Sequence, residues 1–244
     1  MKLEVKNLEK KFNEFTAVNS INFVINEGET LGLLGPNGCG KTTTIGMLLG
    51  LIKPTNGEIL INNTNLQNLD REKVLSEVNF ASPYIELPKK LTVKENLEIY
   101  ARLYGIKDLT NRILEISEDL NLNSFINKKT GELSSGQKNR VSLAKSLINK
   151  PKILFLDEPT ASLDPDIGDF VRQYIENYKS KNKISILLAS HNMREVERLC
   201  NQVIMMKSGS IVDRGTCASL IEKHGRGNLE DTFLKIARNK NELV

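Results

Sequence analysis

Residues 35–42, GPNGCGKT, combine closely spaced glycines with a lysine and a threonine, a pattern suited to holding phosphate groups. The segment follows the apolar run LGLLG (31–35), which predicts a strand, and precedes the helical-looking TTTIGMLLGL. A strand before and a helix after are the context that a phosphate-binding loop requires. The spacing therefore predicts a nucleotide site, rather than a glycine-rich turn that matches by accident.

The residue types in this loop have separate tasks. Gly35, Gly38 and Gly40 allow close approaches of the backbone that a Cβ would block, and the amides and the following helix start would surround phosphates. Lys41 would reach the outer phosphates, and the Thr42 hydroxyl would ligate Mg²⁺. The predicted nucleotide-binding residues of the loop are Gly35, Pro36, Asn37, Gly38, Cys39, Gly40, Lys41, Thr42 and Thr43.

Cys39 stands inside this loop, where we interpret it as a small residue tolerated at a variable position rather than as a functional thiol. Alkylation of Cys39 is expected to block nucleotide binding by bulk, and bound ATP is expected to protect the thiol. The three cysteines of the chain, Cys39, Cys200 and Cys217, are odd in number and widely spaced, which indicates neither a disulfide framework nor a zinc site. A reducing cytoplasm is the compartment that this usage favours.

Two further apolar runs end in polar side chains. KILFLDEP (152–159) ends in Asp157 and Glu158, which alternation along a strand sends in different directions. Asp157 is suited to hold Mg²⁺, and Glu158 to orient and deprotonate a water beside a γ-phosphate; a capping pair at a turn is the alternative. ISILLASH (184–191) ends in His191, at the end of a strand where open α/β sheets place ligands. We expect His191 to hydrogen-bond the γ-phosphate, and we interpret His224 as a surface residue.

The elements that position these residues follow from hydrophobic periodicity. Residues 1–30 alternate polar and apolar, which predicts antiparallel strands, whereas 92–127 has the spacing of amphipathic helices without strands. The runs at 152–159, 184–191 and 202–209 do not alternate, which is typical of strands buried in a parallel sheet. NLEDTFLKIARNK, near the carboxyl end, predicts a short helix.

Composition describes an ordinary globular chain. It has 244 residues, 39% hydrophobic and 26% charged, and a net charge of +4 that is spread along the sequence. Nucleic-acid binding is disfavoured because patches that bind phosphate backbones are usually more basic. No apolar run reaches the length that spans a bilayer, so work at a membrane would need another chain to do the spanning.

Taken together, GPNGCGKTT, LSSGQ (133–137), ILFLDEP, ASLD (161–164) and His191 resemble the nucleotide-binding subunit of ATP-binding cassette (ABC) transporters. The resemblance covers nearly the whole chain and implies an α/β fold: a P-loop core with a mainly parallel sheet, an N-terminal antiparallel β lobe and an inserted α-helical subdomain. It implies a single domain over 1–244. Its parts would be the β lobe and core at 1–83 and 147–215, the helical signature subdomain at 84–146 and a tail helix at 216–244.

The resemblance also implies partners and site residues. Two cassettes, as a homodimer or a heterodimer, would pack head to tail around two ATP molecules. LSSGQ of each would face the ATP of the other, and Asp164 would link the two sites. Phe12 would stack on adenine, with Phe15 as a less favoured substitute. The residues implied at this interface are Ser134, Ser135, Gly136, Gln137 and Asp164.

One position departs from the family. A glutamine that helps to bind Mg²⁺ and senses the membrane partner usually lies between the P-loop and the signature, and here Pro83 falls at its place. Proline has neither a polar side chain nor a backbone N–H. Ser82 or Glu86 is a possible substitute, and the sequence does not decide between them. We therefore expect the proline to affect the affinity for Mg²⁺ and the rate of hydrolysis, but not the binding of ATP.

The sequence thus predicts a Mg²⁺-dependent ATPase of the cytoplasm, peripheral on the inner face of the membrane, that drives a separately encoded integral membrane permease. The segment NLEDTFLKIA resembles the tails of exporter subunits, which favours export. The alternatives are an ATP-binding regulator and a soluble ABC protein without a transport role. The permease contact is expected near residues 82–103, with Tyr84 and Glu86 touching it.

Overall fold

The computed structural model describes residues 1–68, 71–83, 85–161 and 163–238, and they divide into two compact units. The first unit joins Met1–Leu75 with the chain from Ser185 onward, and the second is Ser76–Ile184. Tyr84, which we expected to touch a permease, lies outside the described residues. The boundary predicted for the helical subdomain, 84–146, stays a prediction.

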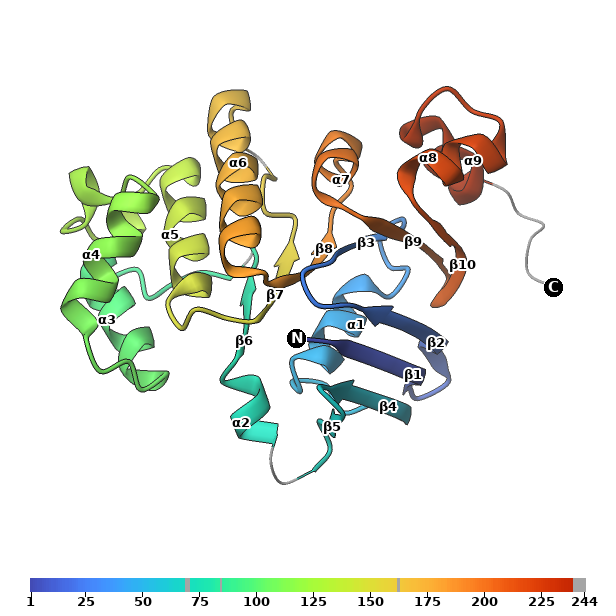
Figure 1. The fold of residues 1–244 in the computed structure, drawn as a ribbon, viewed down its shortest axis with the longest axis horizontal. Helices are drawn as coiled ribbons and strands as arrows, with labels where there is room; N and C mark the ends of the chain where they lie inside the picture. Colours follow the sequence, from blue (N-terminus) through green and yellow to red (C-terminus); the bar gives the residue numbers. More distant parts are fainter. Residues whose placement is uncertain (69–70, 84, 162, 239–244) are drawn as a thin grey trace. The chain divides into compact units, whose positions relative to one another are not determined.

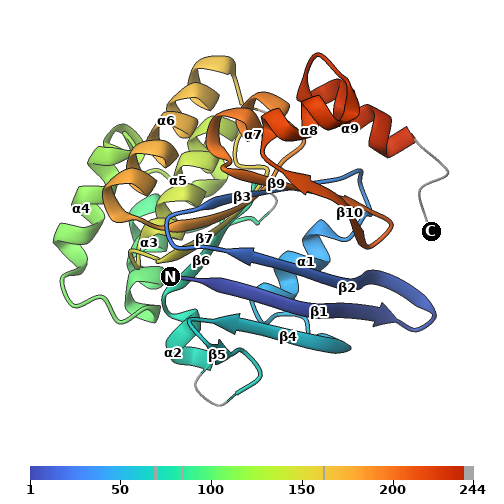
Figure 2. The same ribbon diagram turned by 45° about the vertical axis from the view of Figure 1, so that its right-hand side comes forward.

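The first unit contains an antiparallel sheet in the strand order β2-β1-β4-β5 (Figures 1 and 2). β1 pairs with both β2 and β4, and its residues Leu3, Val5 and Leu8 are buried. Leu3 and Val5 follow the two-residue period of a strand, and a register shift between Val5 and Leu8 lets Leu8 be buried as well. The pairing confirms the antiparallel strands expected at the amino end. The strands are β1 (Leu3–Phe12), β2 (Phe15–Ile25), β4 (Asn56–Ile61) and β5 (Thr64–Asn65).

The same unit contains a parallel group of strands. β3 (Thr30–Leu34) pairs in parallel with β8 (Ser185–Ala189) and with β9 (Gln202–Lys207). β10 (Ser210–Gly215) adds to β9 in the antiparallel direction. Every residue of β3 and β8 is buried, which explains why these runs are apolar without alternation. Two helices lead from the strands, α1 (Lys41–Leu48) after β3 and α7 (Met193–Leu199) after β8.

Two carboxyl-terminal helices, α8 (Cys217–His224) and α9 (Leu229–Arg238), pack on this unit (Figure 1). α9 confirms the helix expected from NLEDTFLKIARNK. The interpretation of His224 as a surface residue was wrong: its Nε2 lies 2.6 Å from Oδ2 of the buried Asp213, and its side chain is 14% exposed. The helices share an apolar cluster with β3, β9 and α7, formed by Leu34, Val196, Val203, Met205, Leu220, Leu229 and Ile236.

The second unit is mainly helical, with one parallel pair of strands. β6 (Val78–Ala81) pairs with β7 (Ile153–Asp157). Among the described residues 92–127 the elements are two α-helices and one 3-10 turn, with no strand, as the periodicity of this stretch predicts. The helices of the unit are α3 (Val93–Leu103), α4 (Leu109–Asp119), α5 (Ser135–Leu147) and α6 (Pro165–Asn182), with short 3-10 turns at Asn123–Phe125 and Thr130–Glu132.

Local sequence sets where these helices begin. Thr92 and Glu95 form a reciprocal capping box at the start of α3, and the Asp108 carboxylate accepts from Asn111 N at the start of α4. The buried Arg112 of α4 donates from Nε to Ile148 O at 3.0 Å, just beyond α5. Its guanidinium therefore satisfies a carbonyl that the helix end leaves without an intrahelical partner.

A short helix, α2 (Arg71–Leu75), completes the described elements. Among the described residues, no helix combines the length and the apolar character needed to cross a lipid bilayer.

Candidate functional site

The glycine-rich loop of the first unit lies between a buried strand and a helix that begins without a side-chain cap. β3 ends at Leu34, and α1 starts at Lys41 with Gly40 as its N-cap. Gly40 has no side chain to cap the helix, and the first turn of α1 carries no acidic residue. The first N–H groups of α1 and the helix dipole therefore point positive potential at the loop, as an anion site requires.

Two glycines of the loop are required by space. A Cβ on Gly35 would lie 2.5 Å from the carbonyl oxygen of Met206, and one on Gly40 would lie 2.5 Å from that of Ala17. Both obstacles are main-chain atoms, which cannot rotate away. Gly40 also has φ of +107°, a conformation that side chains rarely adopt. The backbone can therefore hold this shape only with glycine at both positions.

Lys41 lies folded back over the loop. Its Nζ donates to Gly35 O at 2.6 Å and to Pro36 O at 3.2 Å, and it lies 3.9 Å from Cys39 Sγ. The ammonium group is thus held at the mouth of the loop by weak, neutral acceptors. Phosphate oxygens would give stronger, charge-assisted bonds in the same place.

Cys39 is buried beneath this lysine, with 3% of its surface exposed. Burial raises the pKa of the Cys39 thiol, and the nearby Lys41 offsets only part of that effect. The thiol is therefore held in its unreactive, protonated form. The interpretation of Cys39 as a tolerated small residue stays a prediction.

The described loop residues differ in exposure. Thr42, Asn37 and Gly38 face solvent, whereas Pro36, Lys41 and Thr43 are half-buried. Thr42 therefore offers its hydroxyl oxygen at the open side of the loop, which is the donor type that Mg²⁺ prefers.

His191 follows β8 and is exposed, but its two neighbours are anchored. Ser190 Oγ donates to the buried Glu195 Oε2 at 2.6 Å and accepts from Asn192 N at 3.1 Å. Asn192 in turn caps α7. The turn therefore presents the imidazole outward from a fixed backbone. The sequence analysis did not single out Glu195. An acidic residue four positions after the histidine, at the start of a predicted helix, could have indicated it.

Phe12 and Phe15 lie opposite each other at the tip of the β1–β2 hairpin. Both rings are exposed, Phe12 at 46% and Phe15 at 63%. The Lys10 ammonium lies 4.8 Å from the centre of the Phe12 ring. An exposed aromatic face is available to stack on a planar ring at either position, so the choice of Phe12 stays a prediction.

The acid pair belongs to the second unit. Asp157 is the half-buried last residue of β7, and Glu158 follows it, buried, with φ of +53°. Ala161 N donates to Glu158 O at 3.0 Å and closes the turn. A left-handed residue after an extended one redirects the chain. Glu158 lies beyond the end of β7, so strand alternation does not describe the pair, and the separate tasks of the two carboxylates stay a prediction.

The segment LSSGQ forms the start of α5 through a reciprocal capping box. Gln137 N donates to Ser134 Oγ at 3.3 Å, and Ser134 N donates to Gln137 Oε1 at 3.0 Å. We expected these side chains to offer hydroxyl and amide donors to a phosphate. Their oxygens serve as helix caps, so the Ser134 O–H, the Gln137 NH₂ and the exposed Ser135 hydroxyl are the groups available to donate.

Two other predicted residues of this unit are Gly136 and Asp164. A Cβ on Gly136 would lie 2.7 Å from Ile167 Cδ1, so α5 approaches α6 closely at this point. Asp164 is exposed at the start of α6, directly before Pro165, and its side chain makes no capping hydrogen bond. Its carboxylate is therefore not used by its own helix.

The segment around Pro83 leaves β6 with its polar groups already engaged. Ser82 is buried, and its carbonyl oxygen accepts from Ser142 Oγ and from Ile85 N. Glu86 forms an ion pair with Lys89 at 2.8 Å, and the hydrogen bond from Lys89 holds the pKa of the Glu86 carboxyl below its usual range. Glu86 thus carries a negative charge that Lys89 balances.

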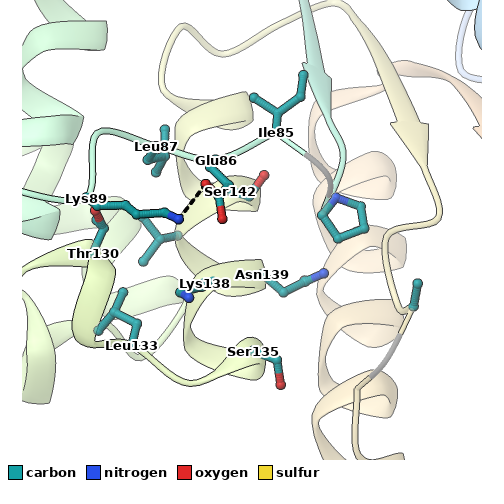
Figure 3. A pocket seen from close by; sticks show the side chains of 13 residues that line it. Ile85, Glu86, Leu87, Lys89, Thr130, Leu133, Ser135, Lys138, Asn139 and Ser142 are labelled. Atoms are coloured by element: carbon teal, nitrogen blue, oxygen red, sulfur yellow. Dashed lines mark ion pairs between the residues drawn. The ribbon is translucent and has the colours of Figure 1, made fainter.

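A pocket of about 230 Å³ opens beside this segment, within the second unit (Figure 3). Its floor is apolar, and Lys89, Lys138 and Glu86 place charges at it. The lining residues are Pro83, Ile85, Glu86, Leu87, Lys89, Thr130, Leu133, Ser135, Lys138, Asn139, Val141, Ser142 and Ala161.

The predicted site residues thus fall into two groups. The nucleotide loop, Phe12 and His191 belong to the first unit, and Asp157, Glu158, Asp164 and the segment LSSGQ belong to the second. Their assembly into one site stays a prediction.

Comparison with known proteins agrees with these features. The sequence model of the ABC transporter family matches residues 18–161. The Nod factor export ATP-binding protein I of Burkholderia orbicola is 36% identical over 222 residues, which cover 90% of this chain and 72% of that protein. The ABC transporter ATP-binding protein NatA of Bacillus subtilis is 35% identical over 221 residues, 89% of each chain.

Solved structures confirm the predicted fold class. A structure described as the ATP-binding subunit of an ABC transporter superposes with a TM-score of 0.88 at 26% identity, covering 98% of this chain and 100% of that one. The dimeric ATP-binding cassette MJ0796 bound to ADP and Pi superposes with a TM-score of 0.80 at 28% identity, covering 88% and 98%. The chain belongs to the ABC transporter family and is an ATPase domain of that family.

Proposed function

We propose that the chain is the ATP-hydrolysing subunit of an ABC exporter, that it dimerises around two ATP molecules, and that it drives a separately encoded membrane permease. The observation that carries the nucleotide role is the start of α1, which has no side-chain cap, behind a loop in which Lys41 is held by neutral acceptors, two carbonyl oxygens and the Cys39 thiol. An export role is supported by relatives named as export ATP-binding proteins.

Within this proposal the loop amides and Lys41 bind the β- and γ-phosphates, and Phe12 stacks on the adenine. Glu158 accepts a proton from the attacking water, and His191 donates a hydrogen bond to the γ-phosphate.

Mg²⁺ fits the donor set of the chain. The Thr42 hydroxyl and the Asp157 carboxylate are hard oxygen ligands, and each lies next to the residues proposed to act on phosphate. The ion would neutralise charge on the phosphates, whereas Thr42 and Asp157 would fix its place. Pro83 contributes no ligand, so we expect weaker metal affinity than in a cassette with glutamine there.

The dimer is proposed from the exposed groups of the second unit. Ser134 and Ser135 are exposed at the start of α5, where their hydroxyl groups can donate to an anion. A γ-phosphate held by a second subunit would satisfy them. The dimeric form of the cassette MJ0796 supports this arrangement.

We assign the permease contact to the pocket in Figure 3. Ile85 is 48% exposed at its edge, Leu87 and Leu133 line it, and Lys89 and Lys138 stand beside the apolar floor. This chemistry suits a short amphipathic helix with an acidic edge from the permease. The position would place the chain peripherally on the inner face of the membrane.

The contact is tested by Ile85→Glu in cells that carry the permease. We expect transport to fall while the purified subunit keeps its ATPase rate, because Ile85 is outside the proposed catalytic groups. Leu114→Glu, at an exposed apolar residue of α4 that does not line the pocket and lies outside residues 82–103, is the matched control. Unchanged transport in Ile85→Glu would remove the assignment.

An ATP-binding regulator with little hydrolysis is the second candidate, and Pro83 is the observation that favours it. Phosphate release by the purified chain decides between the two. We expect release that depends on Mg²⁺, is abolished in Lys41→Ala and is reduced to a slow residual rate in Glu158→Gln. Nucleotide binding without release in the unaltered chain would support the regulator instead.

A further inference from the structure

One face of α5 carries three polar side chains that each donate to a main-chain carbonyl oxygen outside the helix. They are spaced three residues apart and therefore lie along one side of the helix. All three acceptors lie on or just beyond β6 and β7. The bonds run from Asn139 Nδ2 to Pro159 O at 2.6 Å, from Ser142 Oγ to Ser82 O at 3.4 Å and from Lys145 Nζ to Phe80 O at 2.8 Å.

The bond from Asn139 ends beside the proposed base. Asn139 is 7% exposed, and its acceptor Pro159 directly follows Glu158. Glu158 has φ of +53°, a conformation that costs a non-glycine residue free energy and persists only where neighbours enforce it. A short, buried bond to the next carbonyl is such a constraint, because breaking it would leave two polar groups without partners.

The other end of the link is the segment LSSGQ. Asn139 lies one turn along α5 from Ser135, and the intervening Gly136 packs against Ile167 of α6. α5 can therefore shift only if the turn at Glu158 follows, or if the Asn139–Pro159 bond breaks. The connection lies entirely within the second unit.

We propose that Asn139 is a positioning residue that fixes the Glu158 carboxylate and couples it to the segment LSSGQ. The inference rests on the proposed function. In the proposed dimer Glu158 serves the ATP held by its own chain, whereas LSSGQ serves the ATP of the partner. The Asn139–Pro159 bond then makes the geometry of one ATP site depend on closure of the other.

The first test is Asn139→Ala, with Asn79→Ala as the matched control. Asn79 is also buried in this unit and its amide also bonds α5, through Lys145 O at 3.5 Å, but its shorter bond goes to Asn149 Oδ1 at 2.8 Å and neither partner adjoins Glu158. Steady-state rates are divided by the concentration of subunits that bind a fluorescent ATP analogue. A smaller fraction of folded protein then does not lower the reported rate. We expect kcat to fall about tenfold in Asn139→Ala at unchanged KM, which corresponds to about 1.4 kcal/mol. The control should stay within about twofold.

The second test places both changes in a Glu158→Gln background and measures single turnovers. If Asn139 acts through Glu158, removing Asn139 should not lower the turnover rate further in a protein that already lacks Glu158. If Asn139 acts only on the fold, the rate should fall by the same factor in both backgrounds. Asn139→Asp keeps the shape of the side chain but replaces the amide NH₂ with an oxygen, which cannot donate to Pro159 O. If Asn139→Ala does not fold, Asn139→Asp should show the same loss of kcat.

The same fold loss in both backgrounds, or equal losses in Asn139→Ala and Asn79→Ala, would overturn the inference. An unaltered chain without ATPase activity would instead overturn the proposed function, so the two failures are distinguishable.

Discussion

Replacing Gly40 with alanine tests the backbone shape of the nucleotide loop. Comparison with alanine at Gly38 separates the cost of backbone strain from the cost of steric overlap. Its φ is +107°, and an added Cβ would lie 2.5 Å from the carbonyl oxygen of Ala17 in β2. Gly38 has φ of +79° with nothing within 4 Å of the Cβ position. Gly40→Ala therefore adds strain and overlap, whereas Gly38→Ala adds strain alone.

The magnitudes follow from these contacts. The left-handed conformation costs a non-glycine residue about 1–2 kcal/mol, which both variants bear. Overpacking against atoms that must shift costs about 1–3 kcal/mol more, and only Gly40→Ala bears it. A difference of about 2 kcal/mol corresponds to a melting temperature about 4–8 °C lower for Gly40→Ala than for Gly38→Ala, since 1 kcal/mol shifts a protein of this size by about 2–4 °C.

Thermal unfolding without nucleotide measures this difference directly. Gly28→Ala, which has φ of +72° and open space outside the loop, is the control for strain alone and should melt close to Gly38→Ala. ATP binding should be weakened more in Gly40→Ala than in either other variant, because the Ala17 strand and the loop must move apart. A Gly40→Ala protein that melts with Gly38→Ala and binds ATP as tightly would refute the reasoning.

Three further predictions follow from the described contacts. Cys39 should react with a small alkylating reagent more slowly than an exposed thiol at pH 8, because burial raises its pKa above 9.0, and ATP should slow the reaction further; rapid labelling that ATP does not change would contradict this. Burial raises the pKa of the Asp213 carboxyl, but the bonds from Lys223 and His224 outweigh it and lower the pKa below 3.8. The stabilisation that Asp213 adds relative to Asp213→Asn should therefore be complete well above pH 3.8 and shrink as the pH falls below it, in urea unfolding at a series of pH values; a gap that widens toward acid would have the wrong sign. Ser134→Ala removes the cap of α5 and should cost about 1 kcal/mol of unfolding free energy, whereas Ser135→Ala, which removes no cap, should cost less in the same denaturant titration.

Elements with strong patterns were predictable from the sequence. The runs at β7, β8 and β9 were confirmed because buried parallel strands must be apolar on both faces. The helices α3 and α4 were confirmed because one apolar stripe on a polar background fits a helical period. Two glycines of the nucleotide loop, Gly35 and Gly40, are required by nearby main-chain atoms, which gives a physical reason for part of the sequence pattern; nucleotide binding by the loop stays a prediction.

Short elements and distant pairs were not predictable. β6 has four residues, among them the buried polar Asn79, so no periodicity develops in VNFA. The environment of His224 was wrongly predicted because its partner, Asp213, lies in β10, whereas His224 lies in α8. No helical or strand periodicity in the sequence relates the two positions. The bond from Asn139 to Pro159 joins residues 20 positions apart, and the sequence alone gives no reason to pair them.

The central claim is that LSSGQ of one subunit acts on ATP held by another. The most direct test is the solution mass of Glu158→Gln with and without ATP and Mg²⁺, because loss of the base should trap the ATP-bound state. The account predicts a monomer that becomes a dimer only with ATP, and a monomer again when Ser135→Trp blocks the start of α5. A chain that binds ATP with full occupancy and stays monomeric would contradict the account.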